Sequence, residues 1–428
     1  MKTKGLLLNL IVVGMTLGTT WAIRGQFGHE HGAAWAGGVG AVIILLISKR
    51  EDWYGKLFKA TLAAAIGWGL GGIMSYGLVV GYGRGSDFIN VYYGFLMLFV
   101  IGGLYGFLGG GLFGLTLSDS SNNKVKWPLL LIGMTASGFI IYFFFIMQWE
   151  WLMTPPRDES WAACLGMAFF MTWYLIHHKF NSAMRVAVFS GLGGGFGFAF
   201  GNFLQVLGHV SEIPFNFWNV MEYSLGFFGG IGMAYGTFTS AWEKTDSTQT
   251  KSSNFVPLIV AVLIIPFVVW QQSFGMERMQ QTYSKLVEGD INTIGLIIQL
   301  IALALVLIQF GYVLIWYHYR QKDQFVQYDE QGVKTFFMSH FGIYILFSLL
   351  VTGAFISTYR IEQYLYSVNY VIILILLRRT KPVFDEKGTP GNRWGRNFLL
   401  VMLFLAVLAI IAINTHGVLQ GAHQRFEF

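Results

Sequence analysis

The feature that most constrains this chain is a series of apolar stretches, each long enough to cross a lipid bilayer as a helix. A helix needs about 20 apolar residues to span roughly 30 Å of hydrocarbon. Only 12% of the 428 residues are charged, whereas a soluble domain carries roughly 25%. Because hydrocarbon offers no partner to backbone N–H and C=O groups, the stretches predict helices rather than open strands.

We expect an all-α, polytopic transmembrane bundle of about thirteen spans. The spans are predicted at 5–23, 32–48, 60–80, 91–116, 127–147, 160–176, 186–207, 220–241, 255–274, 292–317, 336–357, 364–377 and 397–414. Lysine and arginine support this count, because they gather in cytoplasmic loops. With the first residues inside, all but seven of the 28 basic residues fall on the cytoplasmic side. The seven are Arg24, Arg84, Arg157, Arg278, Lys285, Arg360 and Arg425.

This alternation predicts the orientation of the chain in what we expect to be a bacterial inner membrane. The N-terminus is predicted in the cytoplasm and the C-terminus on the outer side. The first apolar run has no clear cleavage site after it, so we interpret it as a span. Since the basic residues lie in short loops, the net charge of +6 predicts contact with membrane lipids and does not predict nucleic-acid binding.

The first eight spans share landmarks that predict an internal repeat. Asn90-Val91 corresponds to Asn219-Val220, and Gly102-Gly103 corresponds to Gly229-Gly230, at nearly the same offset. A duplicated unit with short loop insertions produces such offsets. We therefore expect a four-helix unit in residues 1–123, a second in 124–250, and a five-helix bundle in 251–428. An even number of spans per unit places the pseudo-twofold axis along the membrane normal. Chance matching of glycines is the alternative.

Glycines are concentrated in the third, fourth, seventh and eighth predicted spans. Small residues let helix backbones approach closely where apolar side chains gain nothing over lipid. A run of glycines also weakens a helix, by roughly 1 kcal/mol per residue relative to alanine. Two interpretations follow: glycine-rich helices that pack closely, or a broken helix that lines a substrate site.

Polar residues near the spans are the candidates for function, because they are costly in a membrane. The densest cluster follows the first span and consists of Arg24, Gln26, His29, Glu30 and His31. The loop after span five is its counterpart in the repeat and holds Arg157, Asp158 and Glu159. His209 and Glu222 belong to the later loop of the second unit. The repeat predicts that the two loops face each other across an outward vestibule.

These side chains suggest binding of a small polar or anionic solute. Arg24 and Arg157 can hold a carboxylate through two hydrogen bonds each. Glu30 with His29 or His31 can titrate near neutral pH and couple a proton to binding. The alternative is an ordinary interfacial loop in which Arg24 pairs only with Glu30. Glu222 lies inside the eighth predicted span, where a carboxylate needs a partner or a proton.

We therefore predict a secondary transporter, because no nucleotide-binding sequence is present; transport would be powered without ATP and can be coupled to protons. One alternative is a membrane transferase acting on a sugar or lipid-linked substrate, with the His29–His31 loop supplying a general base. Another is a structural subunit of a membrane complex. The His-x-His spacing lacks further ligands for a metal, so we expect neither a metal nor another cofactor.

Overall fold

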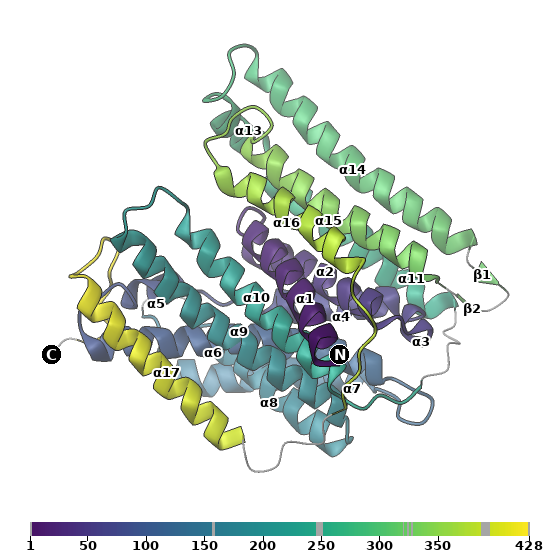
Figure 1. The fold of residues 1–428 in the computed structure, drawn as a ribbon, viewed down its shortest axis with the longest axis horizontal. Coiled ribbons are helices and arrows are strands. Elements are labelled where there is room, and N and C mark those ends of the chain that lie inside the picture. The colour runs from purple at the N-terminus through teal and green to yellow at the C-terminus, as the bar shows by residue number, and fades with distance from the viewer. Residues whose placement is uncertain are drawn as a thin grey trace.

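The computed structural model describes residues 2–155, 159–244, 251–319, 321–322, 325–326, 328–386 and 394–426 (Figure 1). Within these residues the chain is helical, apart from a short antiparallel pairing of β1 (Gln321–Lys322) with β2 (Phe325–Val326). The predicted all-helical class is confirmed. The helices are α1 (Lys2–Arg24), α2 (His29–Ser48), α3 (Glu51–Tyr54), α4 (Leu57–Gly71), α5 (Gly77–Tyr82), α6 (Phe88–Ser118), α7 (Trp127–Tyr142), α8 (Trp161–His177), α9 (Asn181–Val210), α10 (Phe217–Phe238), α11 (Lys251–Ile259), α12 (Ile265–Ser273), α13 (Met276–Tyr283), α14 (Ile291–Tyr319), α15 (Glu330–Thr352), α16 (Ile361–Leu377) and α17 (Trp394–Thr415), with π-helical turns η1 (Phe143–Gln148) and η2 (Val260–Ile264).

Nine helical segments in the described part of the chain are long and apolar enough to cross a membrane. This is compatible with an integral membrane protein. The other four predicted spans fall on three shorter apolar helices, α4, α8 and α16, and on the 22-residue α10. The total of thirteen crossings therefore stays a prediction.

Six helices form a closed ring in which each packs against the next. The order around the ring is α1, α2, α4, α6, α9, α10 and back to α1. Glycines allow the closest of these contacts. A Cβ atom on Gly106 of α6 would overlap the backbone carbonyl of Ser190 on α9, and one on Gly193 of α9 would overlap the carbonyl of Phe228 on α10. The backbones of these helices are therefore in direct contact.

Aromatic rings fill the interior of the ring. Trp68 of α4 is fully buried and lies against glycines of three other helices, Gly37, Gly109 and Gly229, where any side chain would overlap it. The Trp21 ring of α1 lies 4.9 Å from that of Trp68 and 5.0 Å from that of Tyr105 on α6. The centre is thus a packed aromatic core rather than an open channel.

The remaining helices surround the ring and expose apolar side chains. In α14 and α17 only 22% of the most apolar window is buried, against 94% in α2. Figure 1 shows α14, α15 and α16 on one side of the ring and α17 on the other, where it packs on α6 and α9. Exposed apolar faces of this extent suit a hydrocarbon environment. The boundaries of the three predicted units stay a prediction.

After α17, residues 416–426 cross back over α5 and the start of α6, and we call this segment the C-terminal strap. The backbone N–H of Leu419 donates to the Arg84 carbonyl at 3.2 Å, and that of His423 donates to the Gly81 carbonyl at 3.1 Å. The Asn90 side chain donates to the His423 carbonyl at 2.9 Å and accepts from the Arg425 N–H at 2.7 Å. The strap therefore holds α5 from outside the ring.

The predicted repeat is not confirmed. It equates α2 and α4 with α8 and α9. In the structure α2 packs along α4, whereas α8 packs mainly on α7 and touches α9 at few positions. The helices that the repeat equates therefore have different neighbours, and the duplication stays a prediction.

Candidate functional site

Arg24 is the last residue of α1, and its side chain enters the ring instead of reaching water. It is 0% exposed. Its guanidinium lies 4.8 Å from the Trp21 ring and 5.9 Å from the Tyr105 ring. Both rings attract a cation through their negative faces. A buried guanidinium still needs polar partners, because leaving water costs several kcal/mol per ion.

Glu222 of α10 and Tyr76 supply those partners. The Arg24 Nη2 donates to Glu222 Oε2 at 2.7 Å and to the Tyr76 hydroxyl at 2.9 Å. The Tyr76 hydroxyl in turn donates to Glu222 Oε1 at 2.7 Å. Three elements are joined in one closed triangle of hydrogen bonds. Glu222 is only 5% exposed, so the ion pair is shielded from solvent and from salt.

His29, the first residue of α2, completes the cluster. The Arg24 Nη1 lies 2.7 Å from His29 Nδ1. Since a guanidinium can only donate, Nδ1 must be the acceptor, and the ring proton is then on Nε2. The cluster therefore requires a neutral His29, and protonation of that ring would place a donor against a donor.

A break in the polypeptide between α4 and α5 brings Tyr76 to this position. The predicted span 60–80 is interrupted after Gly71, and helix resumes at Gly77. A Cβ atom on Gly71 would overlap the Tyr105 ring, and one on Gly72 would overlap the backbone carbonyl of His29. Only glycine permits such close approach at both positions. Of the two interpretations of the glycine-rich spans, the broken helix therefore applies at Gly71 and Gly72.

A cavity of about 550 Å³ opens beside the broken helix. This volume is typical of sites for small molecules. The lining combines the α1–α2 loop, the break and the start of α10; its residues are Gly25, Gln26, His29, Glu30, Gly72, Ile73, Met74, Ser75, Tyr76, Gly77, Asn216, Trp218, Asn219 and Glu222. The side-chain amide nitrogen of Asn219 is buried and has no hydrogen-bond partner, so it is a donor available to a bound molecule.

The cluster lies level with the middle of α6 rather than with its end. Tyr105, which contacts Arg24, is about 25 Å along α6 from Phe88 at 1.5 Å per residue. Tyr76 contacts Phe198, whose ring is 5.0 Å away and lies near the middle of α9. The sequence suggested a surface loop after the first span, whereas this loop is sunk among longer helices.

The structure places the rest of the predicted Arg24–His31 cluster in and around this cavity. Gln26 and Glu30 line it, and Glu30 is exposed. The alternative in which Arg24 pairs only with Glu30 is wrong, because Arg24 pairs with Glu222. His31 is partly buried, its Nδ1 has no hydrogen-bond partner, and it is not among the lining residues.

The predicted residues of the second loop do not join this cavity where they are described. Glu159 is buried and accepts hydrogen bonds from the backbone N–H groups of Met153 and Thr154, at 2.8 and 2.6 Å, and from Trp161 Nε1 at 2.6 Å. Its carboxylate thus fixes its own loop. Arg157 and Asp158 lie outside the described residues. His209 is exposed near the end of α9. A vestibule shared by the two loops stays a prediction.

Sequence reasoning missed Tyr76 and the polar residues Ser75, Asn216 and Asn219. A tyrosine after a glycine run carries no signal of its own. The one available signal was Glu222, because a carboxylate inside an apolar helix requires a partner. That requirement did not say which of several basic residues the partner would be.

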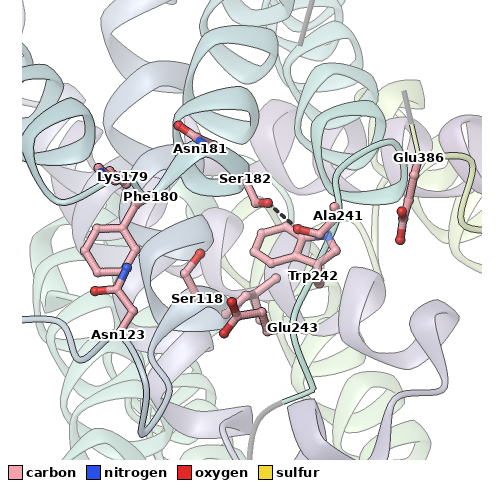
Figure 2. A pocket seen from close by; sticks show the side chains of 11 residues that line it. Ser118, Asn123, Lys179, Phe180, Asn181, Ser182, Ala241, Trp242, Glu243 and Glu386 are labelled. Atoms are coloured by element: carbon pink, nitrogen blue, oxygen red, sulfur yellow. Dashed lines mark hydrogen bonds between the residues drawn. The ribbon is translucent and has the colours of Figure 1, made fainter. Parts of the chain in front are cut away.

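A second cavity, of about 410 Å³, lies at the opposite end of α4, where α6 ends and α9 begins. Figure 2 shows Lys179 and Asn123 on one side of it and Glu386 on the other, with Trp242 and Glu243 between. The Ser182 hydroxyl donates to the Ala241 carbonyl at 2.5 Å. The cavity carries charges of both signs on flexible side chains, and no closed polar cluster like that of Arg24 is built around it.

Among the described residues, no three His, Cys, Asp or Glu side chains are grouped closely enough to hold a metal ion. Comparisons of the chain with protein-family models, with curated proteins and with solved structures gave no match. The arrangement of Arg24, Tyr76, His29 and Glu222 beside a polar cavity is therefore the basis for a functional proposal.

Proposed function

We propose that the protein is a secondary transporter of a small polar solute, and that the cavity at the α4–α5 break is its binding site. The observation that carries the proposal is the broken helix itself, which faces a polar cavity and a buried ion pair level with the middle of α6. Transporters commonly build their sites from interrupted helices, because irregular backbone at membrane depth is tolerated only where it lines a cavity.

Aromatic packing inside the ring and at the far end of α4 supports a state in which the cavity is closed toward that end. Trp21, Trp68 and Tyr105 fill the ring next to Arg24. At the far end of α4, the Trp53 ring lies 5.3 Å from Trp242 and 5.9 Å from Phe384. A solute in the cavity would have to displace these aromatic layers to pass, which is the expected arrangement for alternating access rather than for a channel.

The charges of the cluster bear on the solute and on coupling. Arg24 is neutralised by Glu222, and its Nη atoms are engaged with Glu222, Tyr76 and His29. A neutral polar solute can bind without disturbing that pair. An anionic solute would have to compete with Glu222 for Arg24. We propose that transfer of a proton to Glu222 frees Arg24 in that case, which would couple solute and proton movement.

The finer features of the sequence prediction remain part of this proposal. They are thirteen crossings, an N-terminus in the cytoplasm of a bacterial cell, a C-terminus outside, and a duplicated four-helix origin for spans 1–8. The crossings and the orientation are supported by the distribution of lysine and arginine and by the coincidence of every predicted span with one or more described helices, whereas the duplication rests on the sequence landmarks alone. In this orientation the cavity of Arg24 opens outward.

The test is solute flux into sealed proteoliposomes, with amino acids, hydroxy acids and monosaccharides as radiolabelled candidates. Tyr76→Phe removes a hydroxyl that joins Arg24 to Glu222 and should slow transport at least tenfold. Tyr105→Phe is the matched control, since the Tyr105 hydroxyl is buried without a partner. Equal flux in the two variants would refute the site.

Orientation can be checked in intact cells with a membrane-impermeant thiol reagent. Lys285→Cys should react and Lys381→Cys should not, while the native Cys164 is buried. Conversion of a candidate solute in detergent micelles, where no gradient exists, would favour a membrane enzyme instead.

A further inference from the structure

Two arginines that the transport proposal does not use converge on Gln26. Arg278 on α13 donates from Nη1 to the Gln26 backbone carbonyl at 2.8 Å. Arg360, the residue before α16, donates from Nη1 to the Gln26 side-chain oxygen at 3.4 Å. They come from segments 82 positions apart in the sequence, yet both guanidinium groups are anchored to one residue. Gln26 also lines the cavity beside Arg24.

Neither arginine has a carboxylate partner in the described part of the chain. The ion pairs there are Arg24–Glu222, Lys49–Glu330 and Arg50–Asp52. Both arginines are partly buried. Burial, together with repulsion from Arg360, lowers the pKa of Arg278. Two like charges held near each other disfavour one another, and an anion placed between them would stabilise both.

The field near Arg360 combines a helix start with one carboxylate, because Glu362 lies in the first turn of α16. Arg360 stands at the N-terminus of the 17-residue α16, and no side chain caps that end. The free N–H groups of a helix start carry a partial positive charge. Gln26 offers only neutral oxygens, which satisfy one donor of each guanidinium and compensate neither charge.

We propose that Arg278 and Arg360 form a binding site for a phosphate group at the edge of the cavity, with one guanidinium on each side of the anion. Arginine suits this role because its planar donors match phosphate oxygens in pairs. The phosphate can belong to a lipid headgroup or to a soluble molecule, since the chemistry recognised is the same. The site does not depend on the transport proposal, because binding at Gln26 needs no movement of solute.

The experiment measures the Tm of the full-length protein in detergent, with sodium phosphate replacing sodium chloride at constant ionic strength. A ligand that binds the folded state raises the Tm with its concentration. The wild type should show this rise, and Arg278→Gln and Arg360→Gln should lose it. Lys285→Gln, which removes an exposed charge from the next segment, should keep it. A parallel series adds phosphatidylglycerol or phosphatidylcholine to the micelles.

The outcomes separate the sources of the phosphate. A rise with inorganic phosphate supports a soluble ligand, and a rise with phosphatidylglycerol alone supports a lipid headgroup. Absence of a rise in both series, or a rise that persists in both glutamine variants, overturns the proposal. Tm values in chloride report whether each variant folds. Should a glutamine variant not fold, Arg278→Lys and Arg360→Lys keep the charge and should weaken the rise by removing the paired donors.

Discussion

Replacing Glu222 with glutamine is the sharpest test of the buried Arg24–Glu222 pair. Glutamine has nearly the same shape but no charge, so Arg24 becomes a buried cation whose remaining partners, the Tyr76 hydroxyl and His29 Nδ1, are neutral. Removing one member of a buried pair costs about 3–5 kcal/mol. The amide also cannot accept from both Arg24 and Tyr76 through two oxygens, as the carboxylate does.

We expect Glu222→Gln to lower the free energy of unfolding by about 3–5 kcal/mol. Equilibrium unfolding in mixed micelles, followed by tryptophan fluorescence, measures this loss. Glu30→Gln is the matched control, because Glu30 is exposed and should change the free energy by no more than about 0.5 kcal/mol. The double variant Arg24→Gln/Glu222→Gln should lose less than the sum of its two single variants.

Two results would contradict this reasoning. One is a loss below about 1 kcal/mol in Glu222→Gln, which is the range of an exposed pair. The other is strict additivity in the double variant, which would mean that Arg24 and Glu222 do not interact in the folded state. A loss in Glu30→Gln as large as that in Glu222→Gln would restore Glu30 as the partner of Arg24.

Two further predictions concern the ring and its other end. Gly106→Ala should lower the free energy of unfolding by about 1–3 kcal/mol, because its Cβ would overlap the Ser190 carbonyl. Gly103→Ala on the same helix meets only ordinary contacts and should be neutral or stabilising. The Tm values of the two variants test this, and equal values would refute it. Burial lowers the pKa of Lys56 from 10.5 to about 8, so between these pH values the unfolded state holds a proton that the folded state has released. Stability should therefore rise with pH across this window, by at most roughly 3 kcal/mol, and Lys56→Gln should reduce that rise in a series of Tm measurements.

Hydropathy located most helices but did not reveal the break in the third span. The window 60–80 is apolar throughout, and hydropathy measures composition rather than continuity of the backbone. Gly71 and Gly72 were compatible with tight packing and with interruption. The deciding contacts come from other helices. The Tyr105 ring occupies the space that a side chain on Gly71 would need, and the His29 carbonyl does the same at Gly72.

A single sequence also could not predict which charged residues form pairs. Arg24 and Glu222 are 198 residues apart, and only the helix ring brings them together. The predicted repeat made the loop that holds Glu159 the counterpart of the loop that holds Glu30. In the structure Glu159 is engaged by the N–H groups of Met153 and Thr154, while Glu30 faces a cavity. Equivalent positions along the chain thus give no information on what backbone groups lie nearby.

Because the C-terminal strap packs on α5, the wall of the cavity is complete only after the last part of the chain has been synthesised. Arg84, just after α5, binds the carbonyl of Gln420, which the ribosome adds 336 residues later. Until then the short helix that follows the break has its outer side uncovered. A premature stop before Leu419 would therefore damage a wall built from some of the earliest residues, while leaving every predicted span intact.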